Sequence, residues 1–276
     1  MKSVTAFVGS ARKNGVTHRA TRQFLDGLQA FGDVGSELVF LSDHEIGLCR
    51  GCKACFIRGE EYCPLHDDRD LLLEKMARSD GVVFASPVYS FQVSAHLKAF
   101  LDRLGFALHR PRFHGKTFTS IVVEGLYGGR GVVKYLDFVG GGLGFNVVTG
   151  SRIVCRKNPD TATEPMLEAE RRRMDEVLAR HCRRFHERLT SPPLPEPTLL
   201  HLFGFRMART SMRLELPEDR KDHVYYRERG WFESDYYYPT KLGPLKRAAG
   251  AAFDRMAARS SRAREFHGAG AQGGRS

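Results

Sequence analysis

Short apolar runs alternate with longer amphipathic stretches over the first 150 residues of the chain. Such runs are typical of buried parallel strands, and the stretches between them have the period of helices that cover both faces of a sheet. We expect five strands, at 2–9, 36–41, 81–86, 118–123 and 146–148. We expect helices at 17–31, 68–78, 95–104, 131–139 and 165–189. The predicted fold is therefore α/β, with a doubly wound parallel sheet of five strands.

The last of these helices carries an apolar stripe that we expect to pack on the sheet. Its members recur at helical spacing: Leu167, Met174, Leu178, Cys182, Phe185 and Leu189. A proline-rich segment at 191–197 ends the helix, because proline removes backbone donors and disfavours helix in the residue before it. These features place a first domain at 1–190 and a linker at 191–197.

A C-terminal extension at 198–267 follows the linker. It is rich in arginine and aromatic residues, and a helix is predicted from Pro244 to about Phe266. The ending at 268–276 is small and polar, so we expect it to be disordered. The predicted architecture is thus an α/β domain with a helical, aromatic extension.

Four cysteines lie in the stretch after the second predicted strand. Cys49, Cys52 and Cys55 are spaced by two residues, and Cys63 follows after seven more and precedes a proline. Bacterial ferredoxins hold iron-sulfur clusters with a similar run of cysteines. Zinc and unligated or redox-active thiols stay open as alternatives, although zinc sites usually draw their cysteines from two separated pairs.

Three other residues resemble metal ligands but have simpler explanations. Cys155 and Cys182 are isolated in the sequence, and isolated cysteines are mostly buried as small hydrophobic residues. Asp67 follows a histidine and precedes a second aspartate. We expect Asp67 to cap the helix that begins at about residue 68.

A glycine-rich loop at 9–17 joins the first predicted strand to the first predicted helix. Backbone N–H groups and hydroxyls in such a loop bind phosphate at the positive end of the helix dipole, and Arg12 adds a cation. The loop lacks the Gly-Lys-Ser/Thr ending of a Walker sequence and the Gly-x-Gly-x-x-Gly spacing of a dinucleotide fold. A tight turn from strand to helix explains the glycines equally well, so both interpretations stay open.

A second segment favours the phosphate-binding interpretation of the loop at 9–17. The third predicted strand ends in Ser86-Pro87-Val88-Tyr89-Ser90-Phe91, and Leu97-Lys98-Ala99-Phe100-Leu101-Asp102-Arg103 follows on a helix. Together with the Gly-Ser-x-Arg loop, these residues resemble the NADPH-dependent FMN reductase group of the flavodoxin-like superfamily. The cysteine run between them is similar to that of the iron-sulfur flavoproteins within the group. The resemblance covers about residues 1 to 190, with three motifs in the same order.

The resemblance implies a set of ligand contacts. Near the FMN phosphate it implies Ser10, Arg12, Val16 and Thr17, and Val16 stands where many relatives have asparagine. Around the isoalloxazine ring it implies two loops, which contribute Pro87, Val88, Tyr89, Ser90, Gly125, Gly128 and Gly129. For a 4Fe-4S cluster it implies Cys49, Cys52, Cys55 and Cys63. Ligands of doubly wound sheets lie outside the carboxyl ends of the strands, where the two loops are expected.

The expected function is that of an FMN-dependent oxidoreductase in which the cluster exchanges electrons with the flavin. No catalytic acid or nucleophile is required, because the flavin performs the redox chemistry, and the resemblance implies a homodimer. Three alternatives are an NAD(P)H-dependent FMN or quinone reductase without a cluster, a non-catalytic electron carrier, and a nucleic-acid or membrane binder. The donor and acceptor are expected to be small molecules or proteins.

Charge and composition change this interpretation little. The net charge is +11, but residues 241–276 hold eight Lys or Arg against two acidic residues, so this stretch alone contributes +6. A solvated basic tail explains that excess, and nucleic acid is not an expected partner. No apolar run approaches a membrane span, and the N-terminus runs directly into a strand and not into a signal peptide. We therefore expect no transmembrane segment and a cytoplasmic location.

Overall fold

The computed structural model describes residues 1–156 and 163–272, and the chain forms two compact units. The first unit contains Met1–Gly51 and Leu65–Pro193. The second contains Cys52–Pro64 and the chain from Leu194 onward. The segment at 47–67 that carries four cysteines, here called the cysteine-bearing segment, is therefore divided, because Cys49 belongs to the first unit and the other three cysteines belong to the second.

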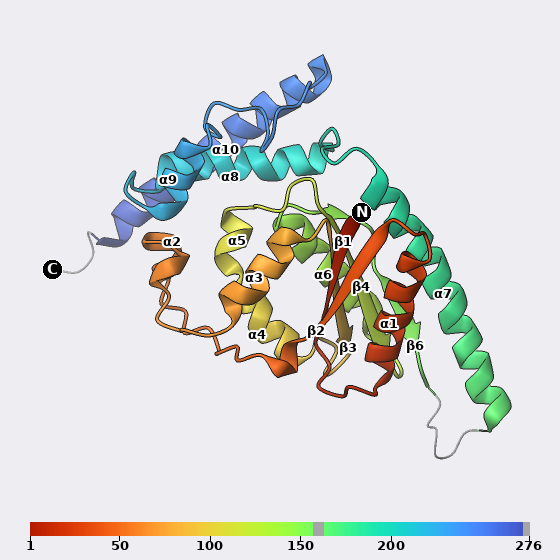
Figure 1. Ribbon diagram of the computed structural model, residues 1–276. Helices are drawn as coiled ribbons and strands as arrows, with labels where there is room; N and C mark the ends of the chain where they lie inside the picture. The colour runs from red at the N-terminus through yellow and green to blue at the C-terminus, as the bar shows by residue number, and fades with distance from the viewer. Residues whose placement is uncertain (157–162, 273–276) are drawn as a thin grey trace. The chain divides into compact units, whose positions relative to one another are not determined.

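A parallel sheet forms the centre of the first unit (Figure 1). Its strand order is β2-β1-β3-β4-β5, which is the flavodoxin-like order and confirms the predicted fold class. The strands are β1 Lys2–Val8, β2 Val34–Phe40, β3 Gly81–Pro87, β4 Thr117–Glu124, β5 Asn146–Val147 and β6 Ser151–Val154. The predicted strands at 2–9, 36–41, 81–86, 118–123 and 146–148 each differ from these bounds by one or two residues.

The fifth position of the sheet is occupied by two short strands where the sequence predicted one. Strand β5 lies beside the start of β4 and β6 lies beside its end, so both pair with the same neighbour. Between them the hydroxyl of Thr119 donates to the carbonyl of Val148, at 2.8 Å. A Cβ on Gly150 would lie 2.0 Å from Ser120 Oγ, so only glycine fits at this break. The sequence did not predict β6, because the break at Gly150 interrupts the apolar run from which a strand is predicted.

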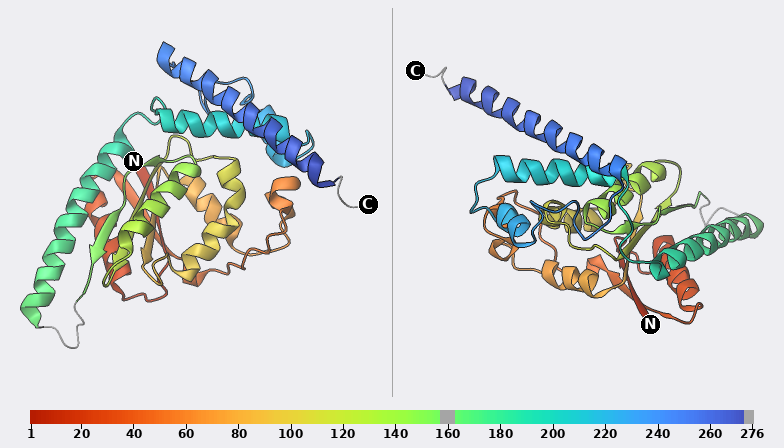
Figure 2. Two further views of the ribbon diagram at one scale, coloured as in Figure 1. Left: turned by 180° about the vertical axis from the view of Figure 1, so that it is seen from behind. Right: turned by 90° about the horizontal axis from the view of Figure 1, so that it is seen from above.

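Helices cover both faces of the sheet, as the sequence predicted (Figures 1 and 2). One face is covered by α1 Val16–Gln29 and α7 Glu164–Thr190. The other is covered by α3 Arg69–Arg78, α4 Ala95–Arg103, α5 Gly105–His109 and α6 Gly129–Gly142. Two 3-10 turns lie at Leu41–Asp43 and Glu60–Tyr62.

The stripe predicted on α7 is buried in its second half. Leu178, Cys182, Phe185 and Leu189 pack with α1 and the sheet in one hydrophobic cluster. Burial raises the pKa of the Cys182 thiol to about 12, so this cysteine is an inert core residue, as expected. The first half of α7 is more exposed, and its stripe residues are only half-buried.

Helices α8 Leu199–Glu215, α9 Lys221–Glu228 and α10 Pro244–Gln272 form most of the second unit. They enclose an aromatic-rich cluster of Leu202, Phe205, Tyr226, Trp231, Phe232, Tyr236 and Leu242. Helix α9 contacts α2 Ala54–Ile57 of the cysteine-bearing segment. Helix α10 continues beyond the predicted end near residue 266 into the ending that was expected to be disordered, and residues 273–276 of that ending lie outside the described residues.

Candidate functional site

The loop after β1 is held tightly against the start of α4. Gly9 N–H donates to the carbonyl of Ala85 at 2.8 Å, and Ser94 Oγ donates to the carbonyl of Gly9 at 2.6 Å. A Cβ on Gly9 would lie 2.5 Å from Ser94 Oγ, so this close approach requires glycine. The contact places the loop at the carboxyl end of β1, beside the end of β3.

The N-terminus of α1 has the properties of an anion site. Its N-cap residue, Gly15, makes no side-chain cap hydrogen bond, and no acidic residue lies in the first turn. The N–H groups of this turn have no intrahelical acceptor, and the helix dipole is positive here. Ser10 and Thr17 are buried at this end, and within the described residues the Thr17 hydroxyl makes no hydrogen bond to protein. Arg12 is exposed and Val16 is half-buried.

The loop after β3 is a strained hairpin turn. Tyr89 and Gln92 exchange two backbone hydrogen bonds, at 3.0 and 2.9 Å, around the two central residues Ser90 and Phe91. Both central residues have positive φ, at 47° and 62°. Non-glycine residues in this region are strained and concentrate at functional sites. Pro87 is the last residue of β3, and Val88 N–H donates to the carbonyl of Val123 on β4 at 2.8 Å.

The loop after β4 reaches the same edge of the sheet. Gly128 has a φ of +102°, and a Cβ there would lie 3.2 Å from Phe91 and 3.4 Å from Val88. The rings of Phe91 and Tyr127 stack at a centroid distance of 5.3 Å. The two loops therefore meet, and large apolar side chains on them stay more than half exposed: Tyr89, Phe91, Leu126 and Tyr127. Rings fixed in this way form a wall suited to a flat apolar ligand.

A buried carboxylate anchors the start of α6. Glu124, at the end of β4, accepts hydrogen bonds from Gly129 N at 2.6 Å and from Arg152 Nη1 at 2.8 Å. A Cβ on Gly129 would lie 2.8 Å from that carboxylate. Gly125 directly follows Glu124, and the Glu124 carboxylate holds the N–H of Gly129, so Glu124 joins the two ends of the loop after β4.

The four predicted ligand cysteines form no disulfide within the described residues. Cys49 and Cys52 are exposed, and Cys55 and Cys63 are half-buried. In the described ranges 1–156 and 163–272, no group of three or more His, Cys, Asp or Glu side chains is gathered closely enough to hold a metal ion. The chemistry of four thiolates suits an iron-sulfur cluster.

A buried ion pair fixes the base of the cysteine-bearing segment. Arg103 on α4 pairs with Asp67 and also donates to the carbonyls of Gly47 at 3.1 Å and Leu65 at 3.4 Å. Burial opposes ionisation of Asp67, but hydrogen bonds from Arg103 and from the N–H groups of Gly47 and Arg69 outweigh it. The pKa of the Asp67 carboxyl consequently lies below its ordinary value of 3.8.

The expected loops included Gly9, Phe91 and Glu124, but the contacts that these residues make were not predicted, and Ser94 and Arg152 were not identified as residues that shape this edge. Phe91 ends the Ser-Pro-x-Tyr segment, and no turn residue there indicates the positive φ that it adopts. Glu124 and Arg152 are 28 residues apart, so only the sheet register brings them together.

The fold and this edge define a class of protein. A flavodoxin-like sheet, an uncapped phosphate-type helix terminus and an aromatic wall at the ends of adjacent strands are typical of flavin-binding α/β proteins. Residues 2–158 match the NADPH-dependent FMN reductase family. The chain belongs to that family, which is one of flavin-dependent oxidoreductases.

Curated relatives agree with this assignment. The chain is 37% identical over 163 residues to an iron-sulfur flavoprotein of Archaeoglobus fulgidus, a match that covers 54% of this chain and 71% of the relative. It is 38% identical over 110 residues to an iron-sulfur flavoprotein of Methanocaldococcus jannaschii, covering 38% of this chain and 55% of the relative. The chain thus spans between about half and about 70% of these two relatives.

Solved structures show the same fold. The protein RosB, with a bound 8-demethyl-8-formylriboflavin-5'-phosphate intermediate, aligns with a TM-score of 0.55 and 14% identity over 88% of this chain and 92% of its own. An apo NADH:FMN oxidoreductase aligns with a TM-score of 0.50 and 18% identity, over 72% of this chain and 97% of its own. At these identities the comparison concerns the fold alone. No helix within the described part of the chain is long and apolar enough to cross a membrane.

Proposed function

We propose that this protein is an FMN-dependent oxidoreductase of the iron-sulfur flavoprotein type. One observation carries the proposal. The uncapped N-terminus of α1 follows β1, and the strained turn at Ser90 and Phe91 follows β3, which is the neighbour of β1 in the sheet. A phosphate and a flat ring joined by a short chain need such a pair of surfaces. When bound there, FMN supplies hydride and single-electron chemistry.

The residues of the loop after β1 are assigned to the phosphate. The hydroxyls of Ser10 and Thr17, the N–H of Val16 and the guanidinium of Arg12 would hold it, supported by the absence of a competing side-chain cap. Val16 contributes only its backbone here, since its side chain has no donor. Arg12 is exposed and is therefore free to close over an anion.

The two aromatic loops are assigned to the isoalloxazine ring. Pro87, Val88, Tyr89 and Ser90 would border it from β3, and Gly125, Gly128 and Gly129 would border it from β4. The strained turn holds Phe91 against Gly128, so the two loops orient together, and the apolar side chains exclude water from the ring that they cover.

We assign Cys49, Cys52, Cys55 and Cys63 to a 4Fe-4S cluster. The presence of four cysteines, their ferredoxin-like spacing and the names of the two relatives support this assignment. We also propose a homodimer, a reducing cytoplasmic location in which thiols persist, and NAD(P)H or a small electron-carrying protein as donor.

An absorption spectrum of anaerobically purified protein, before and after dithionite, tests both cofactors. Flavin bands on a broad background that dithionite bleaches, with about four iron and four sulfide per chain as the cluster type requires, are the expected result. Flavin bands without iron or sulfide, together with NAD(P)H oxidation, would favour the cluster-free FMN or quinone reductase. Bound flavin with no NAD(P)H oxidation would favour the electron carrier.

A further inference from the structure

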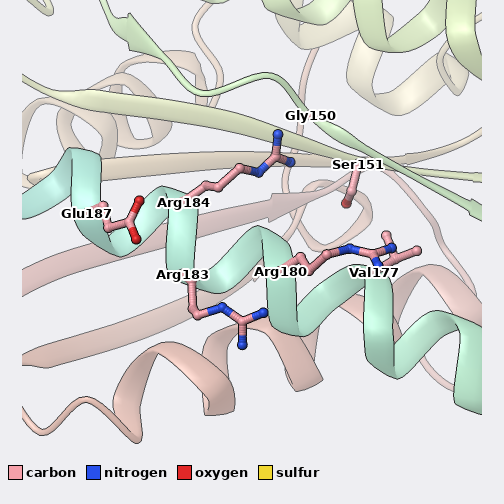
Figure 3. A pocket seen from close by; sticks show the side chains of 7 residues that line it. All are labelled: Gly150, Ser151, Val177, Arg180, Arg183, Arg184 and Glu187. Atoms are coloured by element: carbon pink, nitrogen blue, oxygen red, sulfur yellow. The ribbon is translucent and has the colours of Figure 1, made fainter.

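An arginine-rich groove lies between α7 and β6, on the face of the first unit that carries α1. One cavity of about 520 Å³ is lined by Gly150, Ser151, Val177, Arg180, Arg183, Arg184 and Glu187 (Figure 3). A second, of about 320 Å³, shares Val177 and Arg180 with the first and adds Arg152, Arg156 and Arg173. Cavities of 300 to 1,000 Å³ are the usual size of small-molecule sites.

The positive charge of this groove is only partly compensated. Arg173, Arg180 and Arg183 make no ion pair or hydrogen bond with any residue in the described ranges, and Arg184 makes only a 3.5 Å contact with the carbonyl of Thr149. The carboxylates that line the two cavities are Glu170, Glu176 and Glu187. The Asp137 carboxylate also interacts electrostatically with Arg184, and it accepts a hydrogen bond from Gly150 N at 3.1 Å.

The side chains of the arginines on α7 point in different directions. Figure 3 shows Arg184 reaching toward Gly150 on the sheet side, whereas Arg183 points to the opposite side of α7. Arg180 lies one helical turn before Arg184 and lines both cavities. Arg180 and Arg184 are therefore the two guanidinium groups best placed to act on one ligand.

We propose that this groove binds a small phosphate-bearing molecule of nucleotide size. Guanidinium groups match phosphate oxygens with paired N–H donors, and two of them on adjacent turns match a group that carries more than one negative charge. Gly150, which lines the cavity, lies between the two short strands β5 and β6 where the sheet edge is interrupted, and Ser151 begins β6. The groove is separate from the loop at 9–17 that we assign to FMN.

The groove also has a structural connection to the flavin edge. Arg152 lines the second cavity and pairs with Glu124, whose other oxygen holds the N–H of Gly129. A ligand in the groove would therefore lie next to a side chain that fixes the loop after β4. A simpler role for the arginines is to prevent another strand from pairing with the edge strand β6.

Calorimetric titration of the purified protein with inorganic pyrophosphate, and then with ADP, tests the proposal. We expect one site per chain and an affinity that falls at least tenfold in the double variant Arg180→Gln/Arg184→Gln. The controls are the single variants Arg180→Gln and Arg183→Gln, which remove one charge each from the same helix; Arg180→Gln should weaken binding measurably, whereas Arg183→Gln, whose side chain points to the opposite side of α7, should change the affinity less than twofold. Glutamine preserves helix propensity at exposed positions, and circular dichroism verifies folding.

Several results would overturn the proposal. Equal affinities in the wild type and all variants would indicate general charge attraction, and a loss in Arg12→Ala alone would place pyrophosphate in the FMN loop. Aggregation of the double variant, with no pyrophosphate binding by the wild type, would establish edge protection as the role. Binding to anionic lipid vesicles or to a polyglutamate peptide that pyrophosphate does not displace would assign the surface to a membrane or a protein.

Discussion

Replacing Arg103 with methionine should destabilise the first unit by removing the partner of a buried carboxylate. The side chains of Arg103 and Asp67 are 2% and 8% exposed, so the charge of Asp67 would stay buried without its cation. Removing one member of a buried ion pair costs about 3 to 5 kcal/mol. Because Asp67 keeps the N–H donors of Gly47 and Arg69, we expect about 3 kcal/mol for Arg103→Met.

The pH dependence of this loss has a defined sign. In the wild type the pKa of Asp67 is lowered, so its contribution is present above the unfolded pKa near 3.8 and is lost as the pH falls through the folded value. In Arg103→Met the carboxyl is buried without its cation, so its pKa rises and protonation relieves the penalty. The difference in unfolding free energy between wild type and variant should therefore shrink as the pH falls from 7 to 5.

Urea unfolding followed by circular dichroism measures the global effect, and hydrogen exchange at the Gly47 amide measures the local one. The control is Lys98→Met on the same helix, because Lys98 pairs with Asp102 at 2.6 Å while both side chains are 47% exposed. An exposed pair of this kind contributes about 0.5 kcal/mol or less. Adding Asp67→Asn to Arg103→Met should recover part of the stability, since the double variant buries no charge. A loss in Arg103→Met no larger than that in Lys98→Met, with Gly47 still protected, would refute the reasoning.

Three further outcomes are expected. Arg12→Ala should weaken FMN binding to the apoprotein by roughly 10- to 150-fold, the equivalent of about 1.5 to 3 kcal/mol for a charged hydrogen bond, whereas Lys13→Ala should not, as measured by fluorescence titration. Cys52→Ala should lower the iron content of anaerobically reconstituted protein and keep its FMN, and Cys155→Ala should change neither. His181 is buried and neutral with its pKa lowered to about 3, so its contribution to stability is complete above pH 6.5 and falls by up to about 1.4 kcal/mol per unit toward pH 3. His181→Gln should flatten that part of the stability profile in urea unfolding.

The sequence predicted the sheet well because its central strands are buried on both faces. Every residue of β3 is buried, and so is every residue of β4, and each strand contains a short apolar run, at 82–85 in β3 and at 121–123 in β4. The missed strand β6 has a different pattern, with an exposed Arg152 between two buried residues in a span of four. A pattern that short does not distinguish an edge strand from a loop.

Asp67 shows the limit of local reasoning in a single residue. The N-cap residue of α3 is Asp68 and not Asp67 as predicted, although the Asp67 carboxylate accepts a hydrogen bond from the first helical residue, Arg69 N, at 3.2 Å. The same carboxylate also pairs with Arg103, 36 residues later in the chain, and joins the two ends of the cysteine-bearing segment. Capping follows from spacing along one helix, whereas the pairing depends on the packing of α4 against the loop, which no spacing rule contains.

The departures from local rules concentrate at one edge of the sheet. Gly15 leaves a helix terminus uncapped, Ser90 and Phe91 adopt positive φ without glycine, and Tyr127 exposes an aromatic ring. The two positive φ values cost about 1 to 3 kcal/mol each, whereas glycine at an N-cap costs only a few tenths of a kcal/mol relative to a side-chain cap. Three unrelated departures lie at the ends of neighbouring strands, and one ligand with a phosphate and a flat ring would use the helix terminus and the exposed rings together. This coincidence is physical support for the FMN assignment that is independent of the family resemblance.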